Sequence, residues 1–201
     1  MATTTVLTKV VMTELQAVNK MLRAVDIAPV ASITGTLDLE AENAVERLSE
    51  INRSFQTMGW DFNTRFEVKY LRNVSNQVTL GTNVLSIKPV GNSSWKDFVM
   101  REGKVYDRDP DIDSFTLQED PYLDIVELIN FEDLPQAARD YIAHRATREH
   151  ERFESADDTK TEMATEGELR AWATLVNDHS RSGYETIENN PNVYSSIFGR
   201  E

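Results

Sequence analysis

The hydrophobic pattern of this chain changes its period at one glycine, Gly59. Before it, apolar residues recur every three or four positions from Ala41 to Met58, and Glu and Arg side chains occupy positions between them. After it, residues expected to face inward alternate with polar ones; they are Phe62, Thr64, Phe66, Val68 and Tyr70. The pattern predicts a helix that Gly59 ends, followed directly by a half-buried strand, so the fold must combine both kinds of element.

The residues next to Gly59 predict how this helix ends. With Gly59 as the left-handed residue just beyond the helix cap, Phe55 and Trp60 occupy the two positions whose side chains touch in a Schellman ending. Trp60 is then a packing residue rather than a ligand-stacking ring, and Phe62 begins the inward face of the strand. We therefore expect Phe55, Gly59, Trp60 and Phe62 to form a structural corner.

Three further helices are predicted. The first begins at Thr13, where Thr-Glu-Leu-Gln is a capping box; the apolar residues of 6–11 either extend it backwards or form a separate arm. Asp133 and Pro135 start a third helix, and a fourth runs to about His179. The apolar stripe expected to bury the fourth helix consists of Leu169, Trp172, Ala173 and Val176.

Short strand patterns fill the middle of the chain. Gly103 supplies the positive φ of a β-hairpin turn between two of them. The expected fold class is α+β: a four-helix bundle core, of two N-terminal and two C-terminal helices, with an inserted antiparallel β-domain and an extended C-terminal tail. Residues 1–59 and 131–179 form the bundle, 60–130 the β-domain and 180–201 the tail. The strands are expected at Gln77–Leu80, Val84–Ile87, Asp97–Met100, Val105–Tyr106 and Tyr122–Ile129.

The tail, residues 180–201, is rich in Ser, Gly, Asn and Pro, yet it carries several large apolar side chains. A segment of this composition cannot form its own core, but it has enough anchors to become ordered on a partner. A solvated terminus without a role is the alternative. The residues expected to bind the partner are Tyr184, Ile187, Val193, Tyr194, Ile197 and Phe198.

Composition and motifs exclude several functions. The chain has no cysteine, which removes thiol nucleophiles, disulfides and Cys-type zinc sites. Its formal charge of −13 disfavours an open duplex-DNA-binding surface. No segment approaches the length of a membrane span, and no signal peptide is expected. Phosphate-binding, dinucleotide-binding and hydrolase motifs are absent too, so we expect no catalytic residue and no cofactor.

Two weak patterns suggest metal chemistry. Aspartates alternate over Asp107–Asp113 as in the first half of an EF-hand loop, but the glycine and the bidentate Glu that such a loop needs are missing. A solvated acidic loop is the simpler interpretation. His144 and His150 lie six residues apart, so they do not share a helix face as a zinc-binding pair does. A charged, solvated face is the simpler interpretation of these histidines, and we expect no metal site.

Four segments together resemble a known family. They read, in chain order, ELQAVNKMLRAVDIAPV, AVERLSEINRSFQTMGWDFN, GKVYDRD and DLPQAARDYIAHRATREHERF. They are similar to tail tubular protein A, the adaptor at the head–tail junction of T7-like short-tailed bacteriophages, and the resemblance covers about Thr13 to Phe153. The residues that match its most specific string are Ile51, Asn52, Arg53, Gln56, Gly59, Trp60, Phe62 and Asn63.

The resemblance implies a virion structural protein and not an enzyme. Members of that family form a dodecameric ring between the portal protein and the tail nozzle, which consists of tail tubular protein B. Genomic DNA leaves through the axial channel without specific binding. The resemblance also implies that the bundle mediates ring packing, that the β-domain lies towards the nozzle and that the C-terminal segment engages the portal. The expected location is the virion tail, and the host cytoplasm during assembly.

A tail-associated polysaccharide hydrolase remains the alternative function. Glycosidase chemistry needs two carboxylates at a set separation. The 34 Asp and Glu residues of the chain allow many such pairs without favouring any of them. The alternative therefore has no residue-level support in the sequence.

Overall fold

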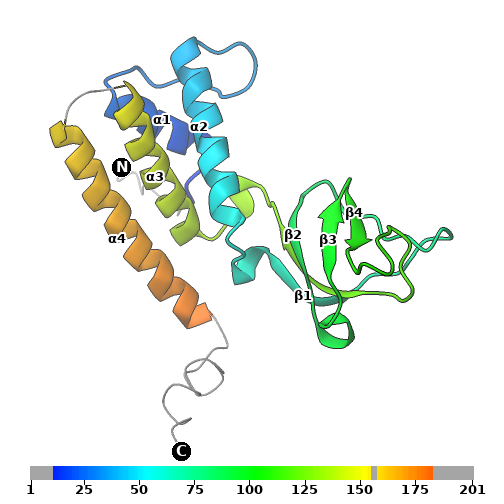
Figure 1. The fold of residues 1–201 in the computed structure, drawn as a ribbon. Helices are drawn as coiled ribbons and strands as arrows, with labels where there is room; N and C mark the ends of the chain where they lie inside the picture. Colours follow the sequence, from blue (N-terminus) through cyan, green and yellow to red (C-terminus); the bar gives the residue numbers. More distant parts are fainter. Residues whose placement is uncertain (1–10, 155–157, 183–201) are drawn as a thin grey trace, which may run out of the picture. The chain divides into compact units, whose positions relative to one another are not determined.

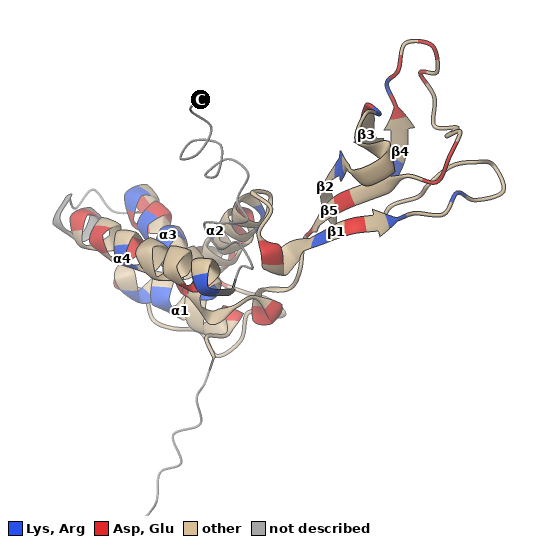
Figure 2. Cartoon of the chain, turned by 90° about the horizontal axis from the view of Figure 1, so that it is seen from below, with Lys and Arg blue, Asp and Glu red and all other residues tan. Residues whose placement is uncertain are grey.

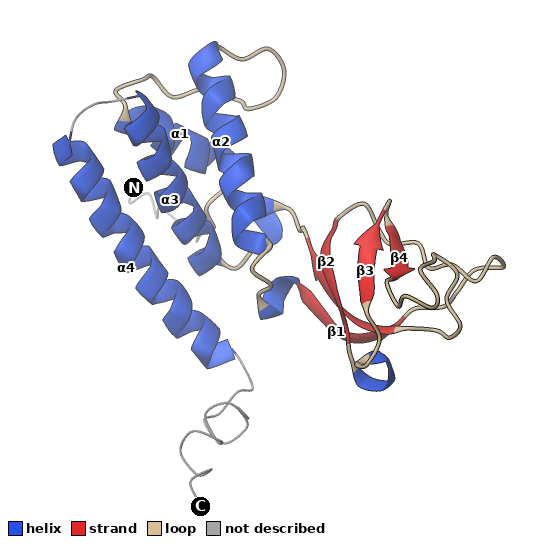
Figure 3. Ribbon diagram, viewed as in Figure 1, coloured by secondary structure: helices blue, strands red, loops and turns tan. Residues whose placement is uncertain are grey.

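The computed structural model describes residues 11–154 and 158–182 (Figure 1). Four helices pack together, and an antiparallel β unit is inserted in the sequence between the second and the third (Figure 3). The predicted α+β class is confirmed. The chain forms two compact units: a helical unit, from the described residues of 1–51 and 131–201, and a β unit, Asn52–Asn130.

Helix α1 (Glu14–Ala24) begins with the predicted capping box. The Thr13 side chain accepts a hydrogen bond from the Gln16 amide at 3.2 Å, and the Gln16 side chain accepts one from the Thr13 amide at 3.0 Å. Because Thr13 has an extended backbone, α1 is not extended backwards. The alternative, a separate arm, concerns residues that fall mostly outside the described part of the chain. The fully buried residues of α1 are Ala17, Val18, Met21 and Leu22.

Helix α2 (Leu39–Gln56) follows the predicted period. The amide of Glu42 donates to the carbonyl of Asp38 at 2.9 Å, which places Asp38 at the N-cap. Met58, expected to continue the apolar stripe, is 61% exposed and lies beyond the helix. The last turn of α2, from Asn52 onwards, belongs to the β unit. The buried side chains of the stripe are Ala41, Ala44, Leu48 and Phe55.

Helix α3 (Gln136–Glu154) lies beside both α1 and α4 (Asp158–Ser182) in the helical unit (Figure 1). Basic and acidic residues are interspersed along these helices (Figure 2). A glycine allows α4 to approach α3 closely: a Cβ at Gly167 would lie 2.8 Å from Nδ1 of His144. Gly167, a weak helix former, therefore stands where the two helices pack closely.

The prediction of which apolar side chains α4 buries is wrong for most of them. Leu169 is 64% exposed and Val176 is 39% exposed; Ala173 is exposed too, and Trp172 is half-buried. Each residue turns a helix by about 100°, so α4 has two apolar faces, and the pattern alone does not tell which one the other helices cover. The side chains that α4 instead buries are Ala171 and Leu175.

The β unit contains a three-stranded antiparallel sheet, in the order β1-β5-β2, and a two-stranded sheet of β3 and β4. The predicted hairpin is confirmed: Glu102 and Gly103 form its two-residue turn, with φ of 51° and 67°. The strands are β1 (Thr64–Lys69), β2 (Val84–Pro89), β3 (Phe98–Arg101), β4 (Lys104–Asp107) and β5 (Tyr122–Glu127).

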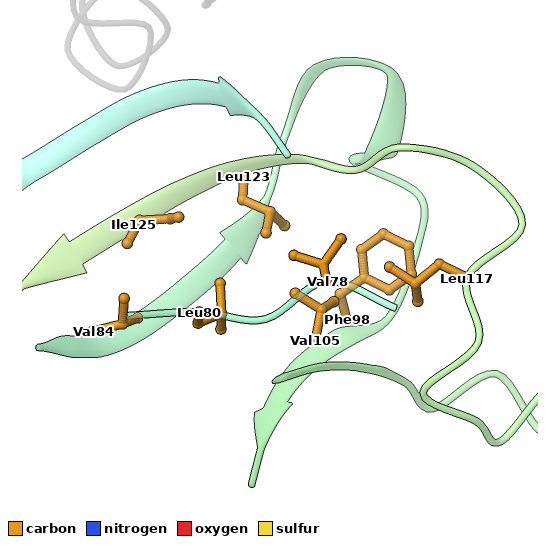
Figure 4. Close-up of a cluster of buried hydrophobic side chains, with 8 residues drawn as sticks. All are labelled: Val78, Leu80, Val84, Phe98, Val105, Leu117, Leu123 and Ile125. Atoms are coloured by element: carbon orange, nitrogen blue, oxygen red, sulfur yellow. The ribbon is translucent and has the colours of Figure 1, made fainter. Parts of the chain in front are cut away.

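The core of the β unit draws residues from strands and from the connections between them (Figure 4). The strand expected over Gln77–Leu80 is wrong, because only Thr79 bridges to Lys104 on β4. The apolar residues of that segment nevertheless point into the core. The members of this core are Val78, Leu80, Val84, Phe98, Val105, Leu117, Leu123 and Ile125.

A β-bulge removes Phe66 from the predicted inward face of β1, whereas Val68 and Tyr70 beyond it are half-buried, as predicted. Phe66 is 61% exposed, because the pairing with β5 shifts its register between Arg65 and Val68. Glu67 has φ of 50° at this point, and its amide donates to Asp124 Oδ1 at 2.8 Å. An extra residue in one strand changes the alternation at the bulge, so a strict period of two does not hold on both sides of it. Regular strand pairing begins only at Thr64, so Phe62, predicted to begin the strand, lies before it.

Candidate functional site

The chain leaves α2 and enters β1 through a turn at Gly59. Gly59 has φ of +74°, and its amide donates to the carbonyl of Gln56 at 3.1 Å, one of the two hydrogen bonds of a Schellman ending. A Cβ at this position would lie 3.1 Å from Cγ2 of Val126 on β5. Both the backbone conformation and the approach of β5 therefore require glycine here.

Trp60 completes this ending with its side chain. In a Schellman ending the Trp60 amide would donate to the carbonyl of Phe55, but here the indole Nε1–H does so, at 3.1 Å. The Phe55 and Trp60 rings stack with centroids 4.9 Å apart. The ring of Phe62, which lies in the 3₁₀ turn Asp61–Asn63, is nearly parallel to that of Trp60 at 6.0 Å. Because Phe55 is fully buried and Trp60 is 9% exposed, these two rings are packed and present no open face to a ligand.

A buried amide ties the end of α2 to the segment after β5. Gln56 has no exposed surface. Its Nε2 donates to Asn52 Oδ1 and to the Ile129 carbonyl, and its Oε1 accepts from the Ile129 amide, each at 2.9 Å. Both donors and the acceptor of this side chain are therefore paired, as a buried amide requires.

A second buried amide, Asn63, joins the two sides of the turn. Its Nδ2 donates to the carbonyls of Gln56 and Glu127, both at 2.9 Å, and its Oδ1 accepts from the Trp60 amide at 2.8 Å. Asn63 is only 3% exposed. The indole of Trp60 occupies the Phe55 carbonyl, which the Trp60 amide would otherwise bind. Asn63 therefore provides the acceptor for that amide.

The corner therefore has an aromatic part and a polar part. Spacing around Gly59 points to the aromatic part, whereas the hydrophobic pattern does not single out Gln56 or Asn63. The signal for them is their place in the string INRSFQTMGWDFN, where polar residues stand at the end of an apolar stripe. The arrangement offers paired amides and packed rings, which fix a backbone path and do not perform acid–base or nucleophilic chemistry.

The acidic loop after β4 uses its carboxylates to cap its own turns. Asp107 Oδ1 accepts from the amide of Asp109 at 3.1 Å, and Asp109 Oδ1 accepts from the amide of Asp111 at 3.0 Å. Asp113 Oδ1 accepts from the Tyr106 hydroxyl at 2.8 Å. These local bonds account for acidic residues two positions apart. Over residues 11–154 and 158–182, no group of three or more His, Asp or Glu side chains is placed to hold a metal ion.

The histidines of α3 do not lie on the solvated face that the sequence suggests. His150 is 1% exposed, and its Nε2 has no hydrogen-bond partner among the described residues. Burial, assisted by the nearby Arg47 guanidinium, lowers the pKa of His150. Burial, assisted by the Lys20 ammonium, lowers the pKa of His144, which is half-buried. Both side chains are thus packing residues that resist protonation.

Exposed apolar side chains of the helical unit occur at two sites, among others. Leu169, Ala173 and Val176, spaced four and three residues apart, line one side of α4; we call this the α4 stripe. At the end of α3, Phe153 is 69% exposed and lies 5.1 Å from the guanidinium of Arg47. The residues that line a surface hollow of ≈ 270 Å³ at this point are Asn43, Glu46, Arg47, Glu50 and Phe153.

The residues expected to bind a partner through the tail lie outside the described part of the chain. They are Tyr184, Ile187, Val193, Tyr194, Ile197 and Phe198. Within the described part, no helix is long and apolar enough to cross a membrane.

Comparison with known proteins identifies the family. No curated protein gives a significant match. A family model described as tail tubular protein matches residues 15–184, which include the whole corner and the whole β unit. Proteins of this family are structural components of the bacteriophage virion tail and assemble with other tail proteins. The chain belongs to the tail tubular protein family.

Proposed function

We propose that this chain is the subunit of a dodecameric adaptor ring that joins the portal protein to the tail nozzle and surrounds part of the DNA exit channel. Family membership already makes it a structural tail component. The observation that supports the more specific role is the α4 stripe, a second apolar helix face that the helical unit leaves exposed.

The α4 stripe is suited to a contact between copies of this chain. Leu169 and Val176 supply apolar area, and the small Ala173 between them permits close approach of another helix. A contiguous exposed apolar face is a liability for a chain that remains alone. Copies joined through two different surfaces close into a ring when the rotation between neighbours allows it. In this proposal the α4 stripe is one of those two surfaces.

The segment after α4 supplies the portal contact in the same proposal. Its apolar residues, from Tyr184 to Phe198, become ordered on the portal and offset the loss of chain entropy by burial there. The β unit supplies the contact with the nozzle protein. DNA passes without specific binding, since a formal charge of −13 per copy repels phosphates instead of capturing them.

Mass measurement of the purified chain with and without purified portal protein tests the proposal. We expect a dodecameric complex on the portal. Combined Leu169→Asn and Val176→Asn substitutions should lower the number of copies that the portal retains, because the contact between copies is lost. The melting temperature should fall only slightly, because Leu169 is 64% exposed, whereas Val176, at 39%, loses part of its packing within the copy.

The matched control is Met163→Gln, at a side chain of α4 that is 70% exposed but lies six residues from Leu169 and hence on another side of the helix. It should leave the complex unchanged. A chain that does not bind portal under any condition contradicts the adaptor role. A full ring that survives the double substitution excludes the α4 stripe as the contact between copies.

A further inference from the structure

The hollow at the end of α3 combines an exposed aromatic ring with unpaired carboxylates. Phe153 is 69% exposed, and the Arg47 guanidinium lies 5.1 Å from the centroid of its ring. Glu46 and Glu50, one turn apart on α2, are both exposed, and neither forms an ion pair with a residue of the described part of the chain. One guanidinium beside two carboxylates leaves one negative charge of the hollow uncompensated.

This lining selects the chemistry of an occupant. Acidic residues alone are often only a solvated surface, but here they border a hollow of ≈ 270 Å³ that contains an exposed aromatic ring. The ring suits an aliphatic side chain, and the excess negative charge suits a lysine or an arginine. The carboxylates repel phosphates, which disfavours DNA as the occupant. The occupant that fits is a peptide segment with aliphatic and basic residues and without acidic ones.

The segment before the described part of the chain has this composition. Residues 1–10, which we call the N-terminal segment, contain one Lys, at position 9, and no Asp or Glu. Their aliphatic residues are Val6, Leu7 and Val10. The segment after α4, residues 183–201, is also partly apolar, but it carries three Glu against one Arg. Charge therefore favours the N-terminal segment over the C-terminal one as the occupant of the hollow.

Met12 fixes the point at which the N-terminal segment leaves the helical unit. The amide of Met12 donates to Gln136 Oε1, and its carbonyl accepts from Arg139 Nη1, both at 2.9 Å. Arg139 is only 8% exposed and also donates to the Leu134 carbonyl at 2.7 Å, so it is held in place. The N-terminal segment therefore starts from the first turn of α3, whereas the hollow lies beside the last turn.

The length of chain before Met12 limits which hollow the N-terminal segment reaches. Gln136 and Phe153 stand near the two ends of α3, and about 26 Å separates them along the helix axis. Leu7 and Lys9 precede Met12 by so few residues that a fully extended backbone carries them at most about 18 and 11 Å from it. A copy therefore cannot bring these side chains to its own hollow, and the occupant has to come from another copy.

We propose that the N-terminal segment of one copy binds in the hollow of the neighbouring copy, with Leu7 against the ring of Phe153 and Lys9 beside Glu46 and Glu50. The inference rests on the proposed function, which places copies side by side in a ring. In an extended segment alternate side chains share a side, so Leu7 and Lys9 face the hollow together. Leu7 supplies the burial, and Lys9 balances the excess charge and excludes acidic segments.

This contact has the geometry that a ring requires. The N-terminal segment of each copy and the hollow of the next are different surfaces, so the same contact repeats from copy to copy until the ring closes. It is separate from the α4 stripe, which lies on another helix. A strand of chain that crosses to the next copy also links neighbours without requiring two flat faces to match.

Disulfide formation tests the inference, because the chain has no cysteine of its own. The full-length variant with Leu7→Cys and Asn43→Cys carries one thiol on the segment and one in the hollow; it is assembled on the portal and oxidised mildly. We expect a ladder of disulfide-linked oligomers on a denaturing gel, since each segment reaches the next copy. The matched control combines Leu7→Cys with Ser49→Cys, at an exposed residue of α2 on another side of the helix, and should not form the ladder.

Charge reversal provides a second measurement. Lys9→Glu should weaken the association between copies on the portal about fivefold, which is near the upper limit for one exposed ion pair. Adding Glu50→Lys should restore the association, because the two charges are then exchanged. A loss that this second substitution does not restore contradicts the contact of Lys9 with the hollow.

The outcomes separate the inference from the function on which it rests. An unsubstituted chain that forms no ring on the portal contradicts the proposed function itself. With the ring formed, the inference is overturned by a missing ladder, by an equal ladder in the Ser49→Cys control, or by disulfides within single chains only. A ladder formed by Leu7→Cys with Val176→Cys instead places the segment on the α4 stripe and also overturns it. If the Asn43→Cys variant melts early, Glu46→Cys, at an exposed residue of the same hollow, decides.

Discussion

At the scale of single residues, the corner combines packed aromatic rings with two uncharged amides. A buried amide stabilises only when all its hydrogen-bonding groups are paired, and it becomes a liability when one partner is removed. Gln56 and Asn63 meet that condition, and between them they bind backbone groups from Gln56 to Ile129. The rings of Phe55 and Trp60 fill the space that these bonds define.

Asn63→Ala is expected to lower the free energy of unfolding by about 3 kcal/mol, because a buried unpaired group costs about 1–3 kcal/mol and the change leaves the Trp60 amide and two carbonyls without this partner. Urea denaturation measures the change. Asn92→Ala, at an exposed asparagine of the same unit, should alter stability by less than about 0.5 kcal/mol. Equal effects of the two substitutions would contradict a stabilising role for the network.

At the scale of elements, sequence predicts well those features whose partners are neighbours in the chain. The capping box at Thr13 and the turn at Gly103 involve residues at most three positions apart, and their chemistry is local. The contact of Phe55 with Trp60 has the same character. The bonds between Gln56 and Ile129 span 73 positions, so no local pattern encodes them.

The predictions that are wrong concern features whose partners lie far away in the chain. Helix α4 has apolar residues on two faces, both of which fit the helical period. Only the contact with the neighbouring helix decides which face is buried. The bulge near Glu67 depends on how β1 meets β5, and the segment around Val78 packs in the core without regular strand pairing. Each of these outcomes is decided by tertiary contacts that follow from the whole fold.

Helix α3 should make stability depend on pH through its histidines. The pKa values of His144 and His150 are lowered in the folded state, whereas in the unfolded chain a histidine titrates near 6.5. Above that pH neither state holds the protons. As the pH falls through 6.5, the unfolded chain takes up protons that the folded chain resists, so stability falls.

Urea denaturation between about pH 8 and about pH 5 measures this dependence. Combined His144→Gln and His150→Gln substitutions should flatten the dependence of the free energy of unfolding on pH, whatever they do to its value at about pH 8. Glu14, whose pKa burial raises, acts in the opposite direction over a window that begins at its ordinary value of 4.5 and extends upwards, and the histidine substitutions leave this contribution unchanged. A slope that the double substitution leaves unchanged would assign the dependence to other groups.

At the scale of the whole molecule, net charge and the α4 stripe act against each other. Copies that each carry −13 repel one another, and salt screens this repulsion, with a Debye length of about 10 Å at about 0.1 M. Apolar contact through Leu169 and Val176 is not weakened by such screening. The balance between the two should therefore shift towards assembly as salt rises.

We expect the portal to retain more copies of this chain, and to retain them longer, as NaCl rises from about 50 mM to about 500 mM. Sedimentation velocity of the complex over that range measures the occupancy. The Leu169→Asn and Val176→Asn double variant is the control: without its apolar contact it should show low occupancy at every salt concentration. An interface held by ion pairs behaves in the opposite way, since screening weakens attraction between opposite charges as well. Copies lost from the ring with rising salt would therefore contradict an apolar contact and point to charged residues between neighbouring copies.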